Sequence, residues 1–442
     1  MKIHPIPTTS SLHGFNMIDT TIMQQTDSIT YSSDRNSDSS TEMADTLTKS
    51  IHVRVHSTEE ELAAIETVWK RHCTHPHADP DFFRTVVRTS PGVKSAYVLS
   101  VERDGEITAL LLGRVEESHL DVHLGYARLP QPKVRTLVFI YGGLLGSPSQ
   151  DECNALADSI SDALKSGIAD VTFFNHLHTE SPLYSSLLKS SGFFTRDRFL
   201  TLAAHRKITI PSSTEELWKQ FKYKARGNFR WNVKTFLKTY ADHYTIECIT
   251  HSSQLEELMR KVEAIASKTY QRSLGVGFGT SAAELERLRL KAEKGWLQAY
   301  ILSIDGTPAA FLCGTVYNGV FHADSMGFDP QYRRTSPGIF LTLNVIEKFC
   351  ELGDEERIIA MDWGLGDARY KSDLCNIDWE DCSLHIFAPT LRGAILNAYR
   401  TPVLAIDHWA RRVFNASVQE KIKGKWRALR TNKSMKSQSA KQ

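Results

Sequence analysis

Several ionisable side chains stand close together in one short loop near the C-terminal end of the chain. The loop Asp362–Lys371 carries two carboxylates, a phenol and an amine, which belong to Asp362, Asp367, Tyr370 and Lys371. Charged side chains are seldom placed in a buried structural loop unless they are paired. These residue types can accept a proton, donate one or hold an anion. The sequence therefore predicts a functional site in this loop.

A second group of residues, upstream of this loop, could hold an anion. Arg333 and Arg334 precede Ser336-Pro337-Gly338, in which serine is a favoured helix N-cap and proline suits the first helical position. The first turn of a helix offers unpaired backbone N–H groups and the positive end of the helix dipole. With two arginines, and a glycine that allows close approach, it could seat a phosphate or pyrophosphate. The alternative is a normally capped helix with two exposed arginines.

Hydrophobic patterning predicts the elements that position these residues. A strand is expected to end at Phe328, a helix to span 337–352 before Gly353, and a second strand to cover 358–363. So short a return predicts parallel strands joined by a right-handed crossover. The second strand would then end at the same edge of the sheet as the helix begins. Ligands bind at that edge in open α/β sheets.

These motifs resemble those of a known superfamily. Arg-x-x-Ser-x-Gly over 333–338 resembles the acyl-CoA pyrophosphate loop of the GNAT superfamily, Arg/Gln-x-x-Gly-x-Gly/Ala, with Ser336 at the first glycine. Together with Asp-Trp-Gly-x-Gly-Asp-x-x-Tyr-Lys over 362–371, it is similar to the BioF2-like branch. That branch comprises acetyltransferases associated with bacterial cellulose and exopolysaccharide synthesis, and it is related to the tandem-GNAT Fem-type transferases. The resemblance is specific over about residues 296–390.

The resemblance implies that an acceptor amine or hydroxyl attacks the acyl-CoA thioester directly, without a covalent enzyme intermediate. Acetyl-CoA or another acyl-CoA would be the cosubstrate, and no metal is expected, because no metal-binding motif occurs in the sequence. The expected pyrophosphate cradle consists of Arg333, Arg334, Ser336 and Gly338.

The same chemistry needs a general base and a donor for the departing thiolate. Asp324, on the strand before the cradle, and Asp362, at the end of the next strand, are the predicted bases. His322 shares a strand face with Asp324 and could serve as the base, although a structural histidine is the commoner case. Tyr370 is the predicted thiolate donor. Lys371 is expected to hold an acceptor anion or to pair with Asp367.

The order of predicted elements occurs twice along the chain. Each half reads strand, helix, β-hairpin, strand, helix, strand, with Asp-Gly turns at 104–105 and 305–306. This repetition predicts an α/β (α+β) protein of tandem GNAT folds, each a mixed sheet flanked by helices. The first half lacks an arginine-containing loop, and we expect it to be a degenerate copy that shapes the acceptor groove. The predicted parts are a disordered tail (1–48), an N-terminal GNAT-like half (50–207), a basic bridging helix (208–242), the C-terminal acyltransferase half (243–414) and a basic tail (415–442).

Composition narrows the class of protein further. The 442 residues hold 53 Lys and Arg against 51 Asp and Glu, a balance that argues against a whole-protein binder of DNA. The seven cysteines include no CxxC pair, so a reducing cytoplasm is expected. No apolar run is long enough to span a bilayer. The stretch 411–442 has ten Lys and Arg against one Glu, which is typical either of a solvated tail or of peripheral contact with the inner membrane.

Two other functions remain open at this point. One is Fem-type aminoacyl transfer from aminoacyl-tRNA, in which the basic helix over 213–240 would hold the RNA. The alternative interpretation is that this helix connects the two halves and that its basic face is exposed to solvent. The other function is that of a non-catalytic adaptor in a polysaccharide synthesis complex. The resemblance implies a sugar or polysaccharide precursor, or a related small acceptor. The sequence itself leaves sugar amine, sugar hydroxyl, amino acid and lipid open as acceptors, together with the choice of N- or O-acylation, the acyl chain length and the oligomeric state.

Overall fold

A computed structural model describes residues 51–124, 127–269, 281–366 and 368–413. The predicted tails over 1–48 and 415–442 lie outside these residues, as does Asp367. Within them, every cysteine is a free thiol, including Cys375 and Cys382. No helix in the described ranges is both long and apolar enough to cross a membrane.

The N-terminal half begins with an edge strand and ends with a strand that leaves it. Its elements are β1 (Ile51–His56), α1 (Glu59–His72), η1 (Pro76–Ala78), α2 (Pro80–Thr89), β2 (Val93–Arg103), β3 (Glu106–His119), β4 (His123–Leu124), β5 (Ala127–Arg128), β6 (Lys133–Gly146), α3 (Gln150–Lys165), β7 (Val171–His178), α4 (Pro182–Ser190) and β8 (Thr201–Thr209).

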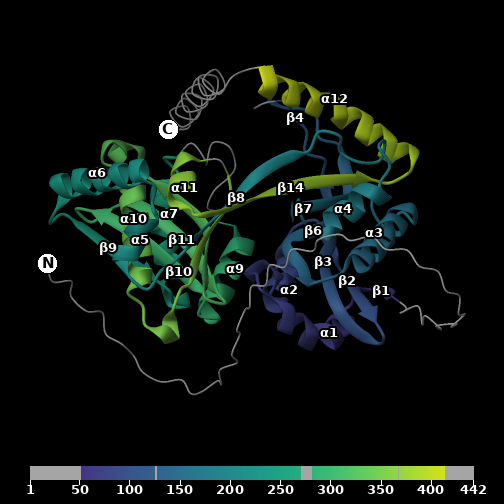
Figure 1. The fold of residues 1–442 in the computed structure, drawn as a ribbon, viewed down its shortest axis with the longest axis horizontal. Helices are drawn as coiled ribbons and strands as arrows, with labels where there is room; N and C mark the ends of the chain where they lie inside the picture. The colour runs from purple at the N-terminus through teal and green to yellow at the C-terminus, as the bar shows by residue number, and fades with distance from the viewer. Residues whose placement is uncertain (1–50, 125–126, 270–280, 367, 414–442) are drawn as a thin grey trace, which may run out of the picture. The chain divides into compact units, whose positions relative to one another are not determined.

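The C-terminal half repeats this order after two connecting helices (Figure 1). Its elements are α5 (Thr214–Gln220), α6 (Tyr223–Tyr240), β9 (Tyr244–Ile249), η2 (Ser252–Gln254), α7 (Leu255–Ala266), α9 (Ala282–Glu293), β10 (Leu297–Ile304), β11 (Thr307–Tyr317), β12 (Val320–Phe328), η3 (Pro330–Thr335), α10 (Pro337–Cys350), η4 (Asp354–Glu356), β13 (Ala360–Leu365), α11 (Arg369–Leu374), β14 (Ile377–Phe387) and α12 (Leu391–Val413).

The predicted fold class is confirmed: a mixed sheet with helices on both faces, built from two halves of one element order. The twelve strands of the main sheet follow the order β1-β2-β3-β6-β7-β14-β8-β13-β12-β11-β10-β9. Both predicted hairpins form, and their Asp-Gly turns take positive φ angles, 55° and 85° at Asp104-Gly105 and 48° and 72° at Asp305-Gly306. In each half a parallel pair is joined by one helix, α3 between β6 and β7 and α10 between β12 and β13.

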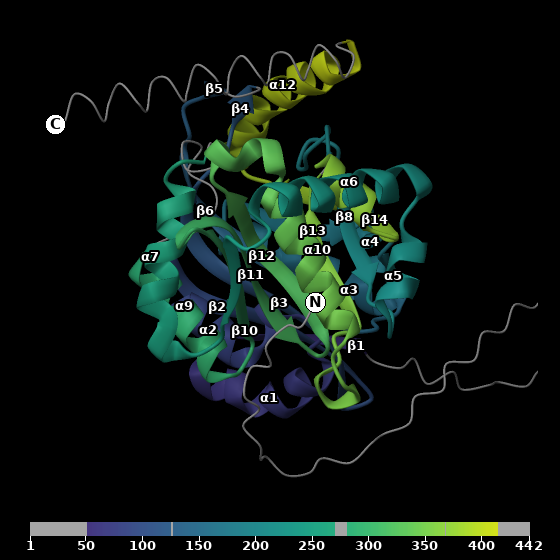
Figure 2. The same ribbon diagram turned by 90° about the vertical axis from the view of Figure 1, so that its left-hand side faces the viewer.

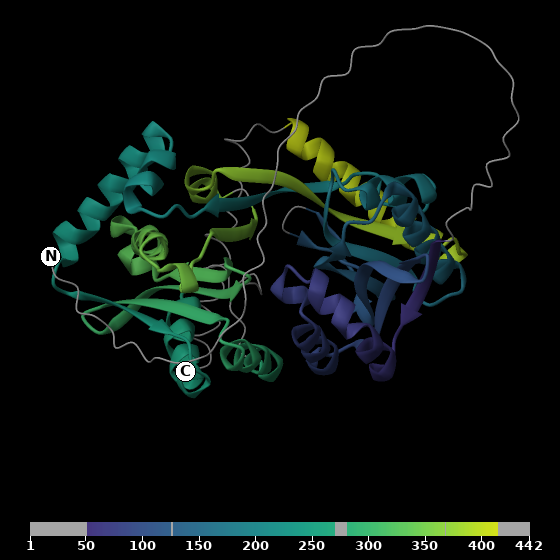
Figure 3. The ribbon, with the colours of Figure 1, turned by 60° about the horizontal axis from the view of Figure 1, so that its bottom comes forward.

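The two halves exchange their last strands. β8, from the N-terminal half, pairs with β13 of the C-terminal half, whereas β14 at the end of the chain pairs with β7. β8 and β14 also pair with each other, antiparallel, from Thr201↔Ser383 to Lys207↔Ile377 (Figure 3). Because of this exchange, residues more than 150 positions apart in the sequence lie side by side where the halves join.

Each half packs helices on both faces of its strands. In the C-terminal half, alternate side chains of β10 and β11 face α5, α6 and α10 on one side and α7 and α9 on the other (Figure 2). The segment 213–240, expected to be one bridging helix, is interrupted at Phe221 and belongs to this core. Phe221, Phe229 and Phe236 are buried, and the Phe236 ring stacks on Phe340 of α10 at 3.9 Å. Because these aromatic rings are buried, the segment is part of the core of the C-terminal half and does more than connect the two halves.

Candidate functional site

A slot opens where β12 and β13 diverge. The two strands pair over only three positions, Val320–His322 with Ala360–Asp362, and then separate. The space between them has a volume of about 490 Å³ and is lined by both strand ends and by α11. This parallel pair, joined by α10, confirms the predicted crossover and puts the end of β13 beside the start of the helix. The predicted loop residues Tyr370 and Lys371 line the slot.

A second cavity, the cleft, adjoins the slot. Its volume is also about 490 Å³, and both halves of the chain line it. His75, His77 and Tyr141 come from the N-terminal half, and Lys291 and His322 from the C-terminal half. The slot and the cleft share Ala323, Asp324, Gly364 and Leu365. A molecule in the slot can therefore meet a molecule in the cleft at the point where the strands part.

The entrance of α10 differs from the capped helix that the sequence predicted. Pro337 occupies the first helical position as expected, but Ser336 has φ 51° and ψ 52° and its side chain makes no capping hydrogen bond. The N-cap role predicted for the Ser336 hydroxyl is thus wrong. The residue adopts the left-handed conformation that glycine tolerates best, which accounts physically for the glycine at this place in the wider motif.

Replacing Ser336 with glycine should therefore stabilise the fold. A left-handed non-glycine residue costs about 1–2 kcal/mol, and the extra chain entropy of glycine returns about 0.5–1 kcal/mol of that. We expect Ser336→Gly to raise the free energy of unfolding by about 0.5–1 kcal/mol, measured by urea denaturation. Ser336→Ala is the matched control and should change it little, because the hydroxyl caps nothing. If the wild type, Ser336→Gly and Ser336→Ala were equally stable, the backbone at Ser336 would not be strained.

Arg333 and Arg334 lie in η3, directly before this helix. Both side chains are exposed, and neither forms an ion pair with any residue in the described ranges. The turn that carries them is fixed by the buried Asp329, which accepts hydrogen bonds from the Gln331 N–H (3.0 Å) and the Lys268 ammonium (2.6 Å). Two unpaired cations are therefore held at the positive end of a helix.

Asp324 is engaged by two partners of its own. Its carboxylate accepts hydrogen bonds from the Lys291 ammonium (2.8 Å) and the Thr315 hydroxyl (2.6 Å). Burial raises the pKa of Asp324, but the charge of Lys291 and these hydrogen bonds outweigh it and hold the pKa below its usual value. A carboxylate stabilised in its ionised form is a weak proton acceptor. The location of Asp324 matches its prediction as a base, whereas its electrostatics favour a structural charge.

A chain of polar side chains starts at Asp362 and runs across the exchanged strands. Asp362 Oδ1 accepts hydrogen bonds from His205 Nε2 (2.7 Å) and from the Gly364 N–H (2.7 Å). His205 Nδ1 donates to Asp381 Oδ2 at 3.0 Å, and Trp379 Nε1 donates to Asp381 Oδ1 at 3.0 Å. His205 comes from β8 and Asp381 from β14, so the strand exchange itself assembles this chain.

The charged groups of these hydrogen-bonded side chains stabilise one another's ionised forms. Burial lowers the pKa of His205, but its hydrogen bonds to two carboxylates raise the pKa above the usual value overall. Burial raises the pKa of Asp362, and the His205 partner reverses that and lowers it. His205 is fully buried and its ring stacks on Trp379 at 4.1 Å. The most stable arrangement is an imidazolium between two carboxylates.

His322, on β12, lies beside these hydrogen-bonded side chains, and its protonation state differs from that of His205. Its Nδ1 lies 4.0 Å from Asp362 Oδ2, and its Nε2 is buried without a hydrogen-bond partner among the residues that the structure describes. Burial lowers the pKa of His322, although the Asp362 and Asp324 charges oppose this effect. His322 is therefore a neutral imidazole with a free nitrogen, lining the cleft beside the slot.

The remaining predicted loop residues occupy distinct positions. The Tyr370 hydroxyl lies 3.0 Å from Met326 Sδ at the wall of the slot, where it could reach a thiolate. The Lys371 ammonium donates to the carbonyl oxygens of Trp363 (2.7 Å) and Leu365 (2.8 Å). These contacts give Lys371 a positioning role for the loop after β13. Its predicted pairing with Asp367 lies outside the described residues.

The equivalent place in the N-terminal half lacks these features. Its third parallel pair is Val138↔Phe173, where the C-terminal half has His322↔Asp362. One position further, Phe139 and Phe174 still pair and their rings stack at 4.9 Å, so β6 and β7 stay together one position longer than β12 and β13. The start of α3 is closed by a capping box of Ser149 and Glu152, which puts a carboxylate where α10 has arginines. That this half is a degenerate copy stays a prediction.

Part of the chain matches a known family of domains. Residues 224–372 match the family model described as an acetyltransferase (GNAT) domain, a span that includes the slot, η3 and the start of α10. Residues 224–372 are therefore similar to GNAT acetyltransferase domains. No curated protein matches the sequence.

Three solved structures are similar to the chain at low identity. FemX is 12% identical over 74% of this chain and 96% of its own, with a TM-score of 0.49. A tandem GNAT protein from the clavulanic acid biosynthesis pathway is 10% identical over 77% and 99%, with a TM-score of 0.47. The C-terminal domain of a putative lysylphosphatidylglycerol synthetase from Agrobacterium fabrum is 13% identical over 78% and 97%, with a TM-score of 0.45.

Proposed function

We propose that this protein transfers an acyl group, most simply acetyl, from acyl-CoA to an amine or hydroxyl of a small acceptor such as a sugar or polysaccharide precursor. The observation that carries the proposal is the meeting of slot and cleft beside His322 and Asp362. The thioester would lie in the slot and the acceptor in the cleft. The acceptor attacks the thioester carbonyl, the carbon–sulfur bond breaks, and coenzyme A leaves as a thiolate.

His322 is the proposed general base. Its unpartnered Nε2 can take the proton of the attacking group, while Asp362 lies on the other side of the ring and stabilises the imidazolium that forms. Asp362, itself predicted as a base, thus orients and supports His322. Asp324 keeps Lys291 in place within the cleft. Tyr370 remains the proposed donor to the departing thiolate.

The cosubstrate's pyrophosphate is proposed to bind at the start of α10. Arg333 and Arg334 supply unpaired positive charge, and the first turn of the helix supplies backbone N–H groups. A Cβ added at Gly338 would meet only Phe328, at 3.5 Å, so the packing of the protein does not require glycine there. Close approach of a ligand gives that glycine a reason. The residues present therefore fit an acyl-CoA.

Removal of the two arginines tests this seat. We expect Arg333→Ala with Arg334→Ala to weaken binding of acetyl-CoA about ten- to hundredfold in calorimetry, because hydrogen bonds to charged groups contribute about 1.5–3 kcal/mol and exposure reduces this. Stability should not change, since neither side chain has an ion-pair partner among the residues that the structure describes. Arg71→Ala, an exposed arginine on α1, is the control and should bind normally.

Calorimetry also separates the competing functions. If the wild-type protein did not bind acetyl-CoA at all, the acyl-CoA proposal would be wrong and a non-catalytic adaptor of a polysaccharide synthesis complex would replace it. If the arginine variant bound as well as the wild type, acyl-CoA would be held elsewhere.

A Fem-type aminoacyl-tRNA donor is the second candidate, favoured by the exposed face of α6. Five basic side chains on or next to this helix are exposed, namely Lys222, Lys224, Arg230, Lys234 and Lys238. Exposed aromatic rings of Tyr223 and Trp231 lie among them. Such a surface suits a nucleic acid, whose binding falls steeply with salt. Activity that needs aminoacyl-tRNA and falls steeply with salt would favour this donor over acyl-CoA.

A further inference from the structure

The outer face of α12 is an uninterrupted apolar stripe. Six of its exposed positions, spaced three or four residues apart, hold Leu391, Ile395, Ala398, Pro402, Ile406 and Trp409. At 3.6 residues per turn these positions fall within a sector of about 80° along about 27 Å of helix. The exposed fractions reach 79% at Leu391 and 63% at Trp409. An exposed apolar face of this length on a helix is typical of an interaction site.

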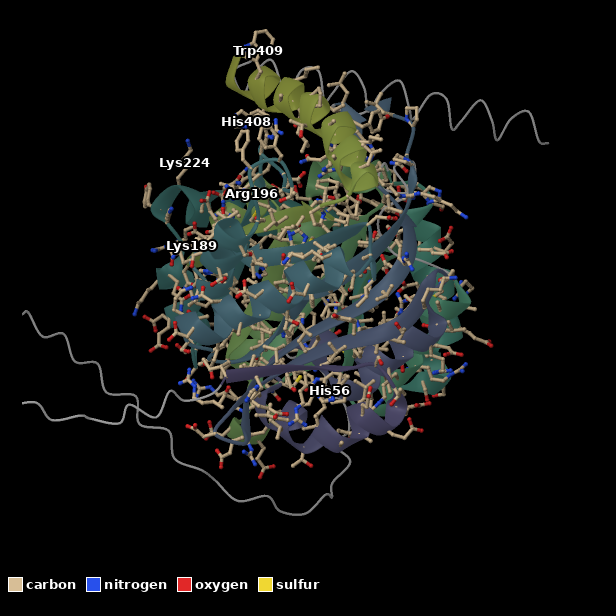
Figure 4. The ribbon with its side chains drawn as sticks, turned by 90° about the vertical axis from the view of Figure 1, so that its right-hand side faces the viewer. His56, Lys189, Arg196, Lys224, His408 and Trp409 are labelled. Carbon is tan, nitrogen blue, oxygen red and sulfur yellow. The ribbon has the colours of Figure 1, made fainter. Side chains whose placement is uncertain are left out.

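The opposite face of α12 is firmly attached to the protein. Leu396 is buried, and Asn397 donates a hydrogen bond to the carbonyl oxygen of Phe194 at 2.5 Å. Arg400 forms an ion pair with the buried Asp197 at 2.9 Å. In Figure 4 the Trp409 ring stands on the outer side of the helix, whereas His408 is directed back toward the protein. The stripe therefore stays presented to the exterior.

Neighbouring residues extend this surface. Phe193 and Phe194, in the loop against which Asn397 packs, are 59% and 73% exposed. Arg198 lies over both of their rings, at 4.5 and 5.0 Å. Aromatic rings combined with a cation are favoured where hydrocarbon meets charged headgroups.

The composition of the segment that follows α12 indicates what kind of partner covers the stripe. Positions 414–442 hold eight Lys and Arg, namely Lys421, Lys423, Lys425, Arg427, Arg430, Lys433, Lys436 and Lys441, against the single Glu420. This segment begins directly after the stripe and attracts an anionic surface. Two copies of the protein packed stripe to stripe with their helices parallel would instead bring two such basic segments together, which their mutual repulsion opposes.

We propose that α12, with Phe193 and Phe194, docks the protein on an anionic phospholipid surface. The stripe would lie in the interface while the basic segment neutralises the headgroups, the two-signal arrangement that gives stable peripheral attachment. This inference does not depend on the acyl-transfer chemistry, because the stripe residues line neither the slot nor the cleft.

Sedimentation of the full-length protein with vesicles tests the proposal. We expect binding to vesicles of phosphatidylcholine with about a third phosphatidylglycerol, and little binding to phosphatidylcholine alone. Ile395→Glu with Ile406→Glu should weaken binding at least tenfold. Tyr223→Glu, at a highly exposed aromatic position on α6, is the matched control and should bind as the wild type does. Both variants should keep the wild-type unfolding temperature, because all three positions are exposed.

Two outcomes would overturn the proposal. If the double variant sedimented with anionic vesicles as well as the wild type, the basic segment alone would bind and the stripe would have another role. If the wild type did not sediment and light scattering showed a dimer that the double variant lost, a second copy would cover the stripe.

Discussion

His322→Gln should lower kcat about 10²–10⁴-fold while leaving the affinity for acetyl-CoA unchanged. The range is that of a lost general base, and glutamine keeps the size and polarity of the side chain. The affinity should not change because His322 lines the cleft and not the slot. The measurement is the rate of CoA release with the best acceptor from a panel of amino sugars and sugars, together with calorimetry of acetyl-CoA.

The pH profile separates a base from a structural histidine. Burial lowers the pKa of His322 from its ordinary value of 6.5, so the neutral, proton-accepting form dominates at and above that pH. The wild-type rate should therefore fall only below pH 6.5, and this acid limb should be absent in His322→Gln. If the rate of His322→Gln also fell below pH 6.5, the titrating group would be a different residue.

His77→Gln provides the control within the same cleft. Burial lowers the pKa of His77 to about 4, and it has no contact with Asp362 in the described structure. Its replacement should affect acceptor binding more than the chemical step. If His77→Gln lost as much kcat as His322→Gln and shifted the acid limb equally, the assignment of His322 as the base would be wrong.

Much of the fold could be predicted because its signals are local. The helix predicted over 337–352 corresponds to α10 (Pro337–Cys350), and the two Asp-Gly turns form the expected hairpins. The crossover from β12 through α10 to β13 followed from the short return between two apolar strands. Turn chemistry and hydrophobic period act over a few residues, so a single sequence contains them.

The part of the site that could not be predicted depends on distant pairings. His205 and Asp362 lie 157 positions apart, and only the exchange of β8 and β14 brings them together. Nothing near His205 in the sequence indicates a partner. His322 was visible as a candidate, but its free Nε2 and its opposition to Asp362 appear only with the sheet register.

Ser336 illustrates a different limit. Serine before proline is a common helix start, so the residue type indicated a capping hydroxyl. The positive φ of this residue comes from η3, which runs directly into α10 and leaves no room for the extended N-cap conformation. The glycine found at this position in the wider motif was the one signal for a left-handed residue.

His205→Ala should produce the largest loss of stability. The substitution removes the imidazolium and leaves Asp362 and Asp381 as two buried carboxylates without their cation. Breaking a buried ion pair by removing one partner typically costs about 3–5 kcal/mol, and we expect a loss of that size in the free energy of unfolding from urea denaturation. His77→Gln, at a partly buried histidine without a carboxylate hydrogen-bond partner in the described structure, should cost much less.

The pH dependence of this loss identifies the imidazolium. Because the pKa of His205 is raised in the folded protein, its contribution is fully present below the unfolded value of 6.5 and is lost as pH rises through the folded pKa. The lowered pKa of Asp362 acts in the opposite sense: its contribution is present above 3.8 and is lost as pH falls through the folded pKa. The wild-type advantage over His205→Ala should therefore be greatest between these limits, from pH 3.8 to 6.5, and decline on either side. An advantage that did not vary with pH would mean that His205 is neutral, and the two carboxylates would then share a proton instead.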